Sequence, residues 1–309
     1  MNNYHHRLIP DDRSPLVILL LFIASMMIGY FVAAFLAFVV IVPTVGSISA
    51  VQGLLTDPSP SQWWTIMLMQ LVTAFTLFVI TPYVFIKLVL GTSINYLFTP
   101  RASVFSKAFG ITVLVTFCFI VVNSLLVEWN SNMVLPEFMS DIENYIRAQE
   151  DRLAQLTEIL TDIKTFDKYL FAMFVIAVIP AIGEELLFRG VLQTFFEKHM
   201  NAHLAILLTA VIFSAFHFQF YGFLPRAALG ILFGYLFYYS GNLVYPIIAH
   251  FVNNGLTLTL VYLYKTEMIQ YDLENSETPS IMIIFLFFLV GLILIALYRR
   301  LFVNTSVDE

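Results

Sequence analysis

The strongest constraint on this fold is three charged side chains inside an apolar segment long enough to cross a membrane. Glu184, Glu185 and Arg189 lie within residues 167–198, which are otherwise predominantly apolar. One charge at the bilayer centre costs roughly 2.5–3.5 kcal/mol on insertion scales, so such groups persist only where they pair, line a cavity or take part in chemistry. We therefore expect these side chains to face other helices rather than lipid.

The whole chain has the composition of a polytopic membrane protein. Of its 309 residues, 60% are hydrophobic and only 12% are charged. The net charge of −6 comes without a basic block, which argues against nucleic acid as a partner and leaves the lipid bilayer as the expected one. We predict an all-α, polytopic transmembrane helix bundle of about eight spans, at residues 15–44, 63–91, 105–127, 167–198, 202–218, 224–240, 243–264 and 281–300.

One long polar segment separates the first three spans from the rest. Its apolar residues recur at spacings of three, four and seven, which predicts amphipathic helix against the bundle or the membrane interface. Ser140 and Glu143 match a capping box at its start. A packed extramembrane cap and a substrate gate both fit this pattern. The resulting regions are a three-span region at 1–127, the amphipathic segment at 128–167, a candidate catalytic core at 168–265, and the last span with its tail at 266–309.

Helix geometry separates the roles of the three charges. Glu185 and Arg189 are four residues apart, so they share a helix face and can form an ion pair. Glu184 lies about 100° further round the helix and needs a partner from elsewhere. His217 and His250, on two later apolar segments, are the candidates, and helix lengths place all three groups near one depth.

This set of residues suggests hydrolytic chemistry. A carboxylate beside an imidazole in a dry bundle can hold and deprotonate water, and Glu184 with His217 has that composition. His250 and Asn254 share a helix face and can donate hydrogen bonds to a developing oxyanion. Asn253 is an alternative donor, although the spacing of four favours Asn254. Water attack combined with an oxyanion site corresponds to amide hydrolysis.

Three motifs in order, each on its own apolar helix, resemble the CPBP family of intramembrane proteases. This family is also called the ABI or CAAX-protease family, and it includes the Ras-converting CAAX endopeptidases. The resemblance implies an endopeptidase that cuts a membrane-associated or lipidated protein or peptide, with Glu184 and His217 activating water, His250 and Asn254 stabilising the oxyanion, and Glu185 with Arg189 as a supporting pair. The matching residues are Glu184, Glu185 and Arg189, then Phe213 and His217, then His250 and Asn254.

Two questions stay open at the level of sequence. Members of this family are described both as metalloproteases and as metal-free, glutamate-dependent enzymes; we assign no cofactor, but Glu184, His217 and His250 are enough ligands for a catalytic zinc. The other open question is whether the chain is an enzyme. A non-catalytic scaffold, a bacteriocin-immunity factor or a proton-coupled transporter would also keep buried acids for binding.

The distribution of Lys and Arg predicts the topology of an integral membrane protein, in the plasma membrane if the chain is bacterial. Positive charges cluster in alternate loops, which predicts that both termini are cytoplasmic. Reporter fusions at residues 50 and 150 should both report the extracytoplasmic side. A cytoplasmic signal at residue 150 would contradict this topology.

Overall fold

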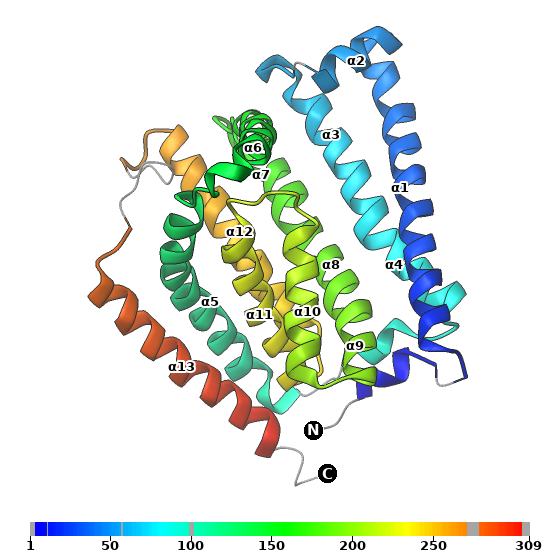
Figure 1. Ribbon diagram of the computed structural model, residues 1–309, viewed down its shortest axis with the longest axis vertical. Coiled ribbons are helices and arrows are strands. Elements are labelled where there is room, and N and C mark those ends of the chain that lie inside the picture. The colour runs from blue at the N-terminus through cyan, green and yellow to red at the C-terminus, as the bar shows by residue number, and fades with distance from the viewer. Residues whose placement is uncertain (1–3, 11, 57, 99–101, 271–277, 305–309) are drawn as a thin grey trace.

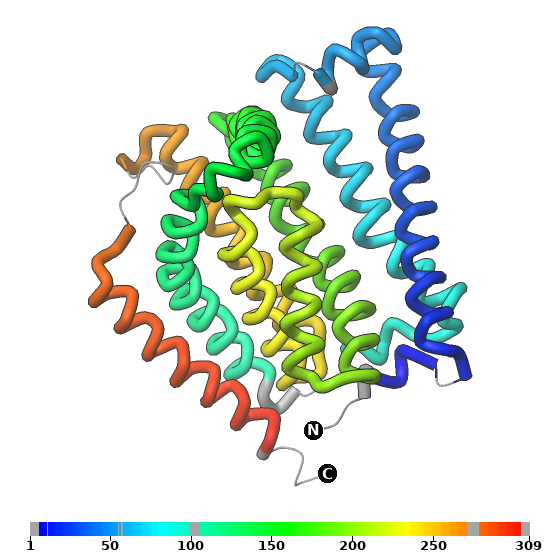
Figure 2. The backbone as a smooth tube through the Cα atoms, in the orientation of Figure 1, coloured from blue at the N-terminus to red at the C-terminus, as the bar shows by residue number. Residues whose placement is uncertain are grey.

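The computed structural model describes residues 4–10, 12–56, 58–98, 102–270 and 278–304, and helices make up most of this part of the chain. Figure 1 shows the long helices side by side, with α2 and α6 at one end of the bundle. The segment η1 and the last turn of α13 lie at the opposite end, as the continuous trace in Figure 2 also shows. The predicted all-α membrane bundle is confirmed.

The helices agree closely with the expected segments. Within the described residues, six helical stretches are long and apolar enough to cross a membrane: Pro15–Val45, Pro60–Val89, Phe105–Ser131, Phe166–His199, Val244–Lys265 and Ile281–Val303. The expected spans at 202–218 and 224–240 form shorter helices, so the count of eight depends on them. In chain order the elements are η1 (Tyr4–Leu8), α1 (Pro15–Val45), α2 (Ile48–Thr56), η2 (Pro60–Gln62), α3 (Trp63–Ala74), η3 (Phe75–Ile80), α4 (Thr81–Val84), η4 (Phe85–Val89), η5 (Ile94–Leu97), α5 (Ala102–Ser131), η6 (Glu137–Met139), α6 (Ser140–Leu160), α7 (Phe166–Ala172), η7 (Met173–Val178), α8 (Ile179–Glu185), η8 (Leu186–Gln193), α9 (Thr194–His199), α10 (Ala202–Ala215), α11 (Phe223–Ser240), α12 (Val244–Lys265) and α13 (Ile281–Asn304).

The helix that carries the three charges runs without a break from α7 to α9, even though it contains Pro180. The stretches η7 and η8 within it are π-helical, and η7 comes directly before the turn that holds Pro180. Proline lacks an N–H and crowds the carbonyl four residues earlier. A wider π turn relieves this crowding, so the helix continues. The same arrangement occurs at Pro82, which follows the π-helical η3.

Two glycines bring α11 into close contact with its neighbours. A Cβ on Gly230 would lie 2.9 Å from the Cβ of Ala210 on α10, and one on Gly234 would lie 2.8 Å from Ile206 on the same helix. The small residues at this spacing therefore serve helix packing, as their pattern predicts. Close approach also exposes the α11 carbonyls to the charged helix, and Gln193 Nε2 donates to the Gly234 carbonyl at 3.0 Å.

The amphipathic helix α6 lies across the end of the bundle at 140–160, but the expected capping box is absent. Ser140 is its first helical residue, and the preceding residue makes no side-chain cap. Glu143 instead accepts hydrogen bonds from the Leu135 amide at 2.9 Å and from Arg147 at 2.7 Å. These contacts hold the pKa of the Glu143 carboxyl below its usual value. The ion pair with Arg147 satisfies Glu143, so it does not reach back to cap the helix.

We expect the substitution Gly230→Ala to destabilise the protein. The added methyl group would clash with the Ala210 Cα at 3.0 Å, which can move only with its helix, and overpacking of this kind costs about 1–3 kcal/mol. Thermal unfolding of the purified protein in detergent measures the effect. Gly110→Ala is the matched control, because no atom outside its own helix lies within 4 Å of the new Cβ. Equal melting temperatures for the two variants would contradict the packing role.

Candidate active site

The centre of the candidate site is the ion pair between Glu185 and Arg189. Both side chains are fully buried, and Arg189 Nη1 donates to Glu185 Oε1 at 2.8 Å. Arg189 Nη2 donates to the Gly230 carbonyl at 2.9 Å. The guanidinium carbon also lies 4.8 Å from the ring centre of Phe213 and 5.4 Å from that of Phe233. The predicted pair therefore forms, and it ties the charged helix to α10 and α11.

His250 of α12 joins this pair from the other side. Its Nδ1 lies 2.8 Å from Glu185 Oε1, the same oxygen that binds Arg189. Because an ionised carboxylate only accepts hydrogen bonds, Nδ1 must carry a proton and donate it. The ring also stacks on Phe233, with centroids 5.2 Å apart and an angle of 22° between the planes. Glu185 and Phe233 together fix the orientation of the imidazole and direct its Nε2 toward Glu184.

Among the described residues, Glu184 differs from Glu185 because it forms no ion pair at hydrogen-bond distance. Its Oε2 is buried and has no hydrogen-bond partner within the described parts of the chain. Nε2 of His250 lies 3.9 Å from that oxygen, which is longer than a direct hydrogen bond. A buried carboxylate oxygen without a partner is costly, and Glu185 Oε2 is also buried without a partner, so the two neighbouring acids together can accommodate another polar group.

His217 contacts Phe213, the ring that also contacts His250. Its Nδ1 lies 3.0 Å from the Phe213 carbonyl, which can only accept, so Nδ1 donates and Nε2 of the neutral ring keeps a lone pair. The Phe213 ring contacts both imidazoles, with centroid distances of 5.1 Å to His217 and 6.1 Å to His250. His250 is thus the imidazole in ion-pair range of Glu184. The helix α10 ends at Ala215, so the chain has already turned when it reaches His217.

Asn254 lies one helical turn beyond His250 on α12. Its Nδ2 donates to the Ile176 carbonyl at 3.3 Å, and its Oδ1 accepts from Asn253 at 3.0 Å. One N–H of the Asn254 amide is then left for another acceptor, since the group has two. The two asparagines form a connected pair rather than alternatives, and the one predicted from the spacing is the one that contacts the charged helix.

Sequence reasoning assigned no role to Arg226, at the start of α11. Its guanidinium donates to Gln219 at 2.7 Å and to the Gly222 carbonyl at 3.2 Å. Its charge is close enough to interact with the carboxylate of Glu184 and the ring of His217. A lone arginine at the start of an apolar segment, nine residues after His217, was the available signal. The structure adds this cation to the electrostatic surroundings of the site.

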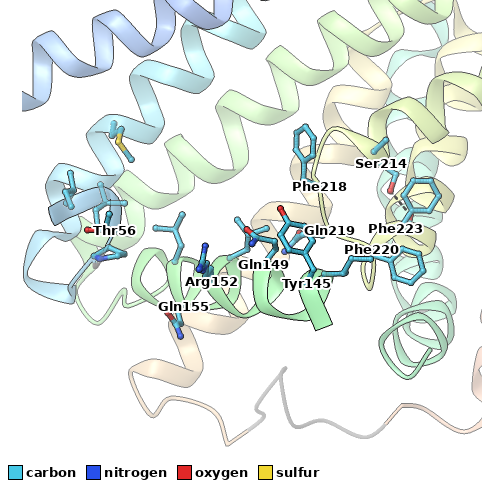
Figure 3. Close-up of a pocket in the computed structure, with 18 residues that line it drawn as sticks. Thr56, Tyr145, Gln149, Arg152, Gln155, Ser214, Phe218, Gln219, Phe220 and Phe223 are labelled. Atoms are coloured by element: carbon cyan, nitrogen blue, oxygen red, sulfur yellow. Dashed lines mark hydrogen bonds between the residues drawn. The ribbon is translucent and has the colours of Figure 1, made fainter. Parts of the chain in front are cut away.

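A large cavity lies next to the turn that carries His217. Its volume is about 1150 Å³, and α6, the α2–α3 region and the α10–α11 turn form its walls. Figure 3 shows Phe218 projecting into this space opposite Tyr145 and Gln149 of α6. Phe218 has a left-handed backbone with φ of 53° and is 85% exposed. None of Glu184, His217, His250 or Asn254 is among the described residues that line this cavity.

The side chains as placed do not fit a zinc ion. A catalytic zinc takes three protein ligands and leaves one position open. Over the described residues, no group of three His, Cys, Asp or Glu side chains comes together in a way that could hold a metal. We therefore derive no step through a metal.

We expect Glu185→Ala to destabilise the protein more than Arg189→Lys does. Loss of the carboxylate leaves a buried guanidinium and an imidazole without their shared acceptor, at a cost of about 3–5 kcal/mol. Lysine at position 189 keeps the charge and one donor. Yield and melting temperature of the purified variants measure the difference, with the exposed Glu158→Ala as control. Undiminished yields for both variants would show that the pair is dispensable to folding.

Comparison with known proteins finds two similarities, and both are partial. Residues 166–256 match the family model described as type II CAAX prenyl endopeptidase Rce1-like. The chain is also similar to the uncharacterized protein YpbD of Bacillus subtilis (strain 168), at 35% identity over 109 residues, which are 34% of this chain and 52% of that protein. The chain thus spans about half the length of this relative, and no solved structure matches it. The matched segment 166–256, which is similar to type II CAAX prenyl endopeptidases of the Rce1-like family, contains every candidate site residue from Glu184 to Asn254.

Proposed function

We propose that this protein is an intramembrane endopeptidase that uses Glu184 to activate water. The observation that carries the proposal is the buried Glu184 oxygen without a hydrogen-bond partner, 3.9 Å from His250 Nε2. Its neighbour Glu185 is committed to Arg189 and His250, so Glu184 is the acid left to act on a reactant. A carboxylate in such a dry site can take a proton from a bound water.

The proposed reaction is balanced without a cofactor. The water oxygen attacks the carbonyl carbon of the peptide, a proton passes to Glu184, and the carbonyl π electrons move to oxygen. The C–N bond then breaks as the oxyanion collapses. Glu184 gives its proton to the departing nitrogen, which leaves as an amine, and the carboxylate is regenerated.

The other polar residues have supporting roles in this proposal. Nε2 of His217 keeps a lone pair when the ring is neutral, which suits it to accept a hydrogen bond from the water while Glu184 takes the proton. Asn254 has one N–H left to donate to the oxyanion. His250 can donate there only when both ring nitrogens carry protons, because its Nδ1–H is already bonded to Glu185. Arg226 adds positive charge on the side of His217.

The substrate in this proposal is a membrane-associated protein or peptide. Glu184 lies in the stretch Phe166–His199, which is long and apolar enough to cross a membrane. A substrate must therefore reach it from the bilayer or from the bilayer surface. The family description names CAAX prenyl endopeptidases, and on this likeness we extend the proposal to lipidated substrates.

We expect Glu184→Gln to abolish cleavage while the protein stays folded. Glutamine keeps the shape and hydrogen-bonding capacity of the side chain but cannot take the proton. Asn254→Ala removes one oxyanion donor and should lower kcat by about 10²–10³-fold. His217→Ala should approach the severity of Glu184→Gln, since groups that act as a unit are not additive. Comparing the new N-termini in membranes from cells with the wild-type and the Glu184→Gln protein finds substrates for these assays.

The control is the melting temperature of each variant, which should stay close to that of the wild type for Glu184→Gln. A Glu184→Gln protein with full activity on a verified substrate would end the proposed role of this residue. If Glu184→Gln and wild-type membranes yielded the same N-termini, the scaffold and transporter alternatives would be favoured over an enzyme.

A further inference from the structure

We propose that the large cavity beside the His217 turn binds an extended apolar peptide segment that carries a carboxylate, and that Arg152 of α6 recognises this carboxylate. This inference rests on the proposed function, because the bound segment is taken to be part of the substrate. The carboxylate can belong to an acidic side chain or to a free C-terminus. Both present the same planar pair of oxygens to a guanidinium.

One face of α6 forms a wall of this cavity. Tyr145, Gln149 and Arg152 follow one another at spacings of four and three, so they lie on the same side of the helix. Figure 3 shows Arg152 and Gln149 on this side, whereas Gln155 points away from the centre of the space. The α6 helix therefore presents an aromatic ring, an amide and a cation in a row toward the cavity.

The charge of the described cavity lining is positive. Helix α6 carries five acidic residues, but none of them is among the 18 residues known to line the cavity, where Arg152 is the charged one. Within the described structure Arg152 makes no ion pair or hydrogen bond, unlike Arg147 on the same helix, which is bonded to Glu143. An unpaired guanidinium in a concave, partly apolar wall is suited to a carboxylate ligand.

The cavity is large enough for a peptide and has the groups that a peptide needs. Its volume of about 1150 Å³ exceeds the ~300–1,000 Å³ typical of small-molecule pockets. An extended peptide has backbone N–H and C=O groups that require partners, and the side chains of Gln149 and Gln219 supply both donors and acceptors. Leu153, Phe220 and Phe223 give it apolar walls.

One hydrogen bond and one longer-range charge interaction relate this cavity to the proposed catalytic acid. Gln219 lines the cavity and accepts a hydrogen bond from Arg226 at 2.7 Å. The charge of Arg226 in turn interacts with Glu184. Helix α6 also holds the α10–α11 turn in position. The Tyr221 amide donates to Glu150 at 2.8 Å, and the Tyr221 hydroxyl donates to Glu143 at 3.2 Å. A peptide in the cavity would thus lie against the turn that carries His217.

Peptide binding to the full chain with the Glu184→Gln substitution, in nanodiscs of phosphatidylcholine, tests the proposal. The probes are fluorescein-labelled peptides of one Leu- and Phe-rich sequence. One ends in a carboxylate, one in an amide, and two further amidated peptides contain an internal Asp or Asn. We expect Arg152→Gln to weaken binding of a carboxylate-bearing peptide about fivefold and to leave its neutral counterpart unchanged. Arg152→Lys should restore part of the affinity.

Lys164→Gln is the matched control, since it removes one positive charge from the same end of the bundle outside the described cavity lining. The terminal and the internal carboxylate peptides show which source of the carboxylate is preferred. Equal affinity of charged and neutral peptides, or no binding of any peptide, would overturn the proposal. It would also be wrong if Arg152→Gln weakened only the binding of phosphatidylglycerol, measured by native mass spectrometry, because the cavity would then be a lipid site.

The proposed function fails by a different measurement. Cleavage of a verified substrate by the Glu184→Gln protein would remove the enzyme mechanism whatever the peptide affinities are. Conversely, a protease that depends on Glu184 but shows no effect of Arg152→Gln on charged peptides would keep its mechanism and lose this specificity site.

Discussion

The structure depends on a single buried carboxylate oxygen. Glu185 Oε1 accepts from Arg189 on its own helix and from His250 on α12, at 2.8 Å in both cases. Removing Arg189 or Glu185 would leave the other charge buried without its partner. This constraint explains why three charges are tolerated in an apolar helix. Two of them neutralise each other and orient an imidazole, and the third is left beside that imidazole.

The α11 helix supplies hydrogen-bond acceptors for the buried polar side chains of the charged helix. Arg189 and Gln193, one turn apart, donate to the carbonyls of Gly230 and Gly234, which are also one turn apart. These carbonyls are reachable because the glycines let α10 and α11 pack closely. Packing and polar satisfaction therefore depend on the same two positions. Inside a bilayer no water is available to accept a hydrogen bond from a buried donor, so these carbonyls act as the acceptors instead.

The amphipathic helix α6 connects the bundle to the turn after α10. Its acidic residues hold Tyr221, with Arg147 lying 4.3 Å above the centre of that ring. Another face of the same helix lines the cavity under Phe218. An extramembrane cap and an element that shapes substrate access need not be alternatives, because one helix can pack on a turn with one side and line a cavity with the other.

The sequence by itself determined the helical class, the extents of the long apolar helices and the Glu185–Arg189 pair, because these follow from local periodicity and from spacings within one helix. It also placed Gly230 and Gly234 at a helix contact. Only the tertiary structure decided that His250 rather than His217 lies in ion-pair range of Glu184, since that depends on where α10 ends and how α12 is rotated. Local sequence patterns also could not predict that the helix continues through Pro180, because packing decides where a π turn forms. Nor could they predict the position of Arg226, which depends on contacts between distant segments.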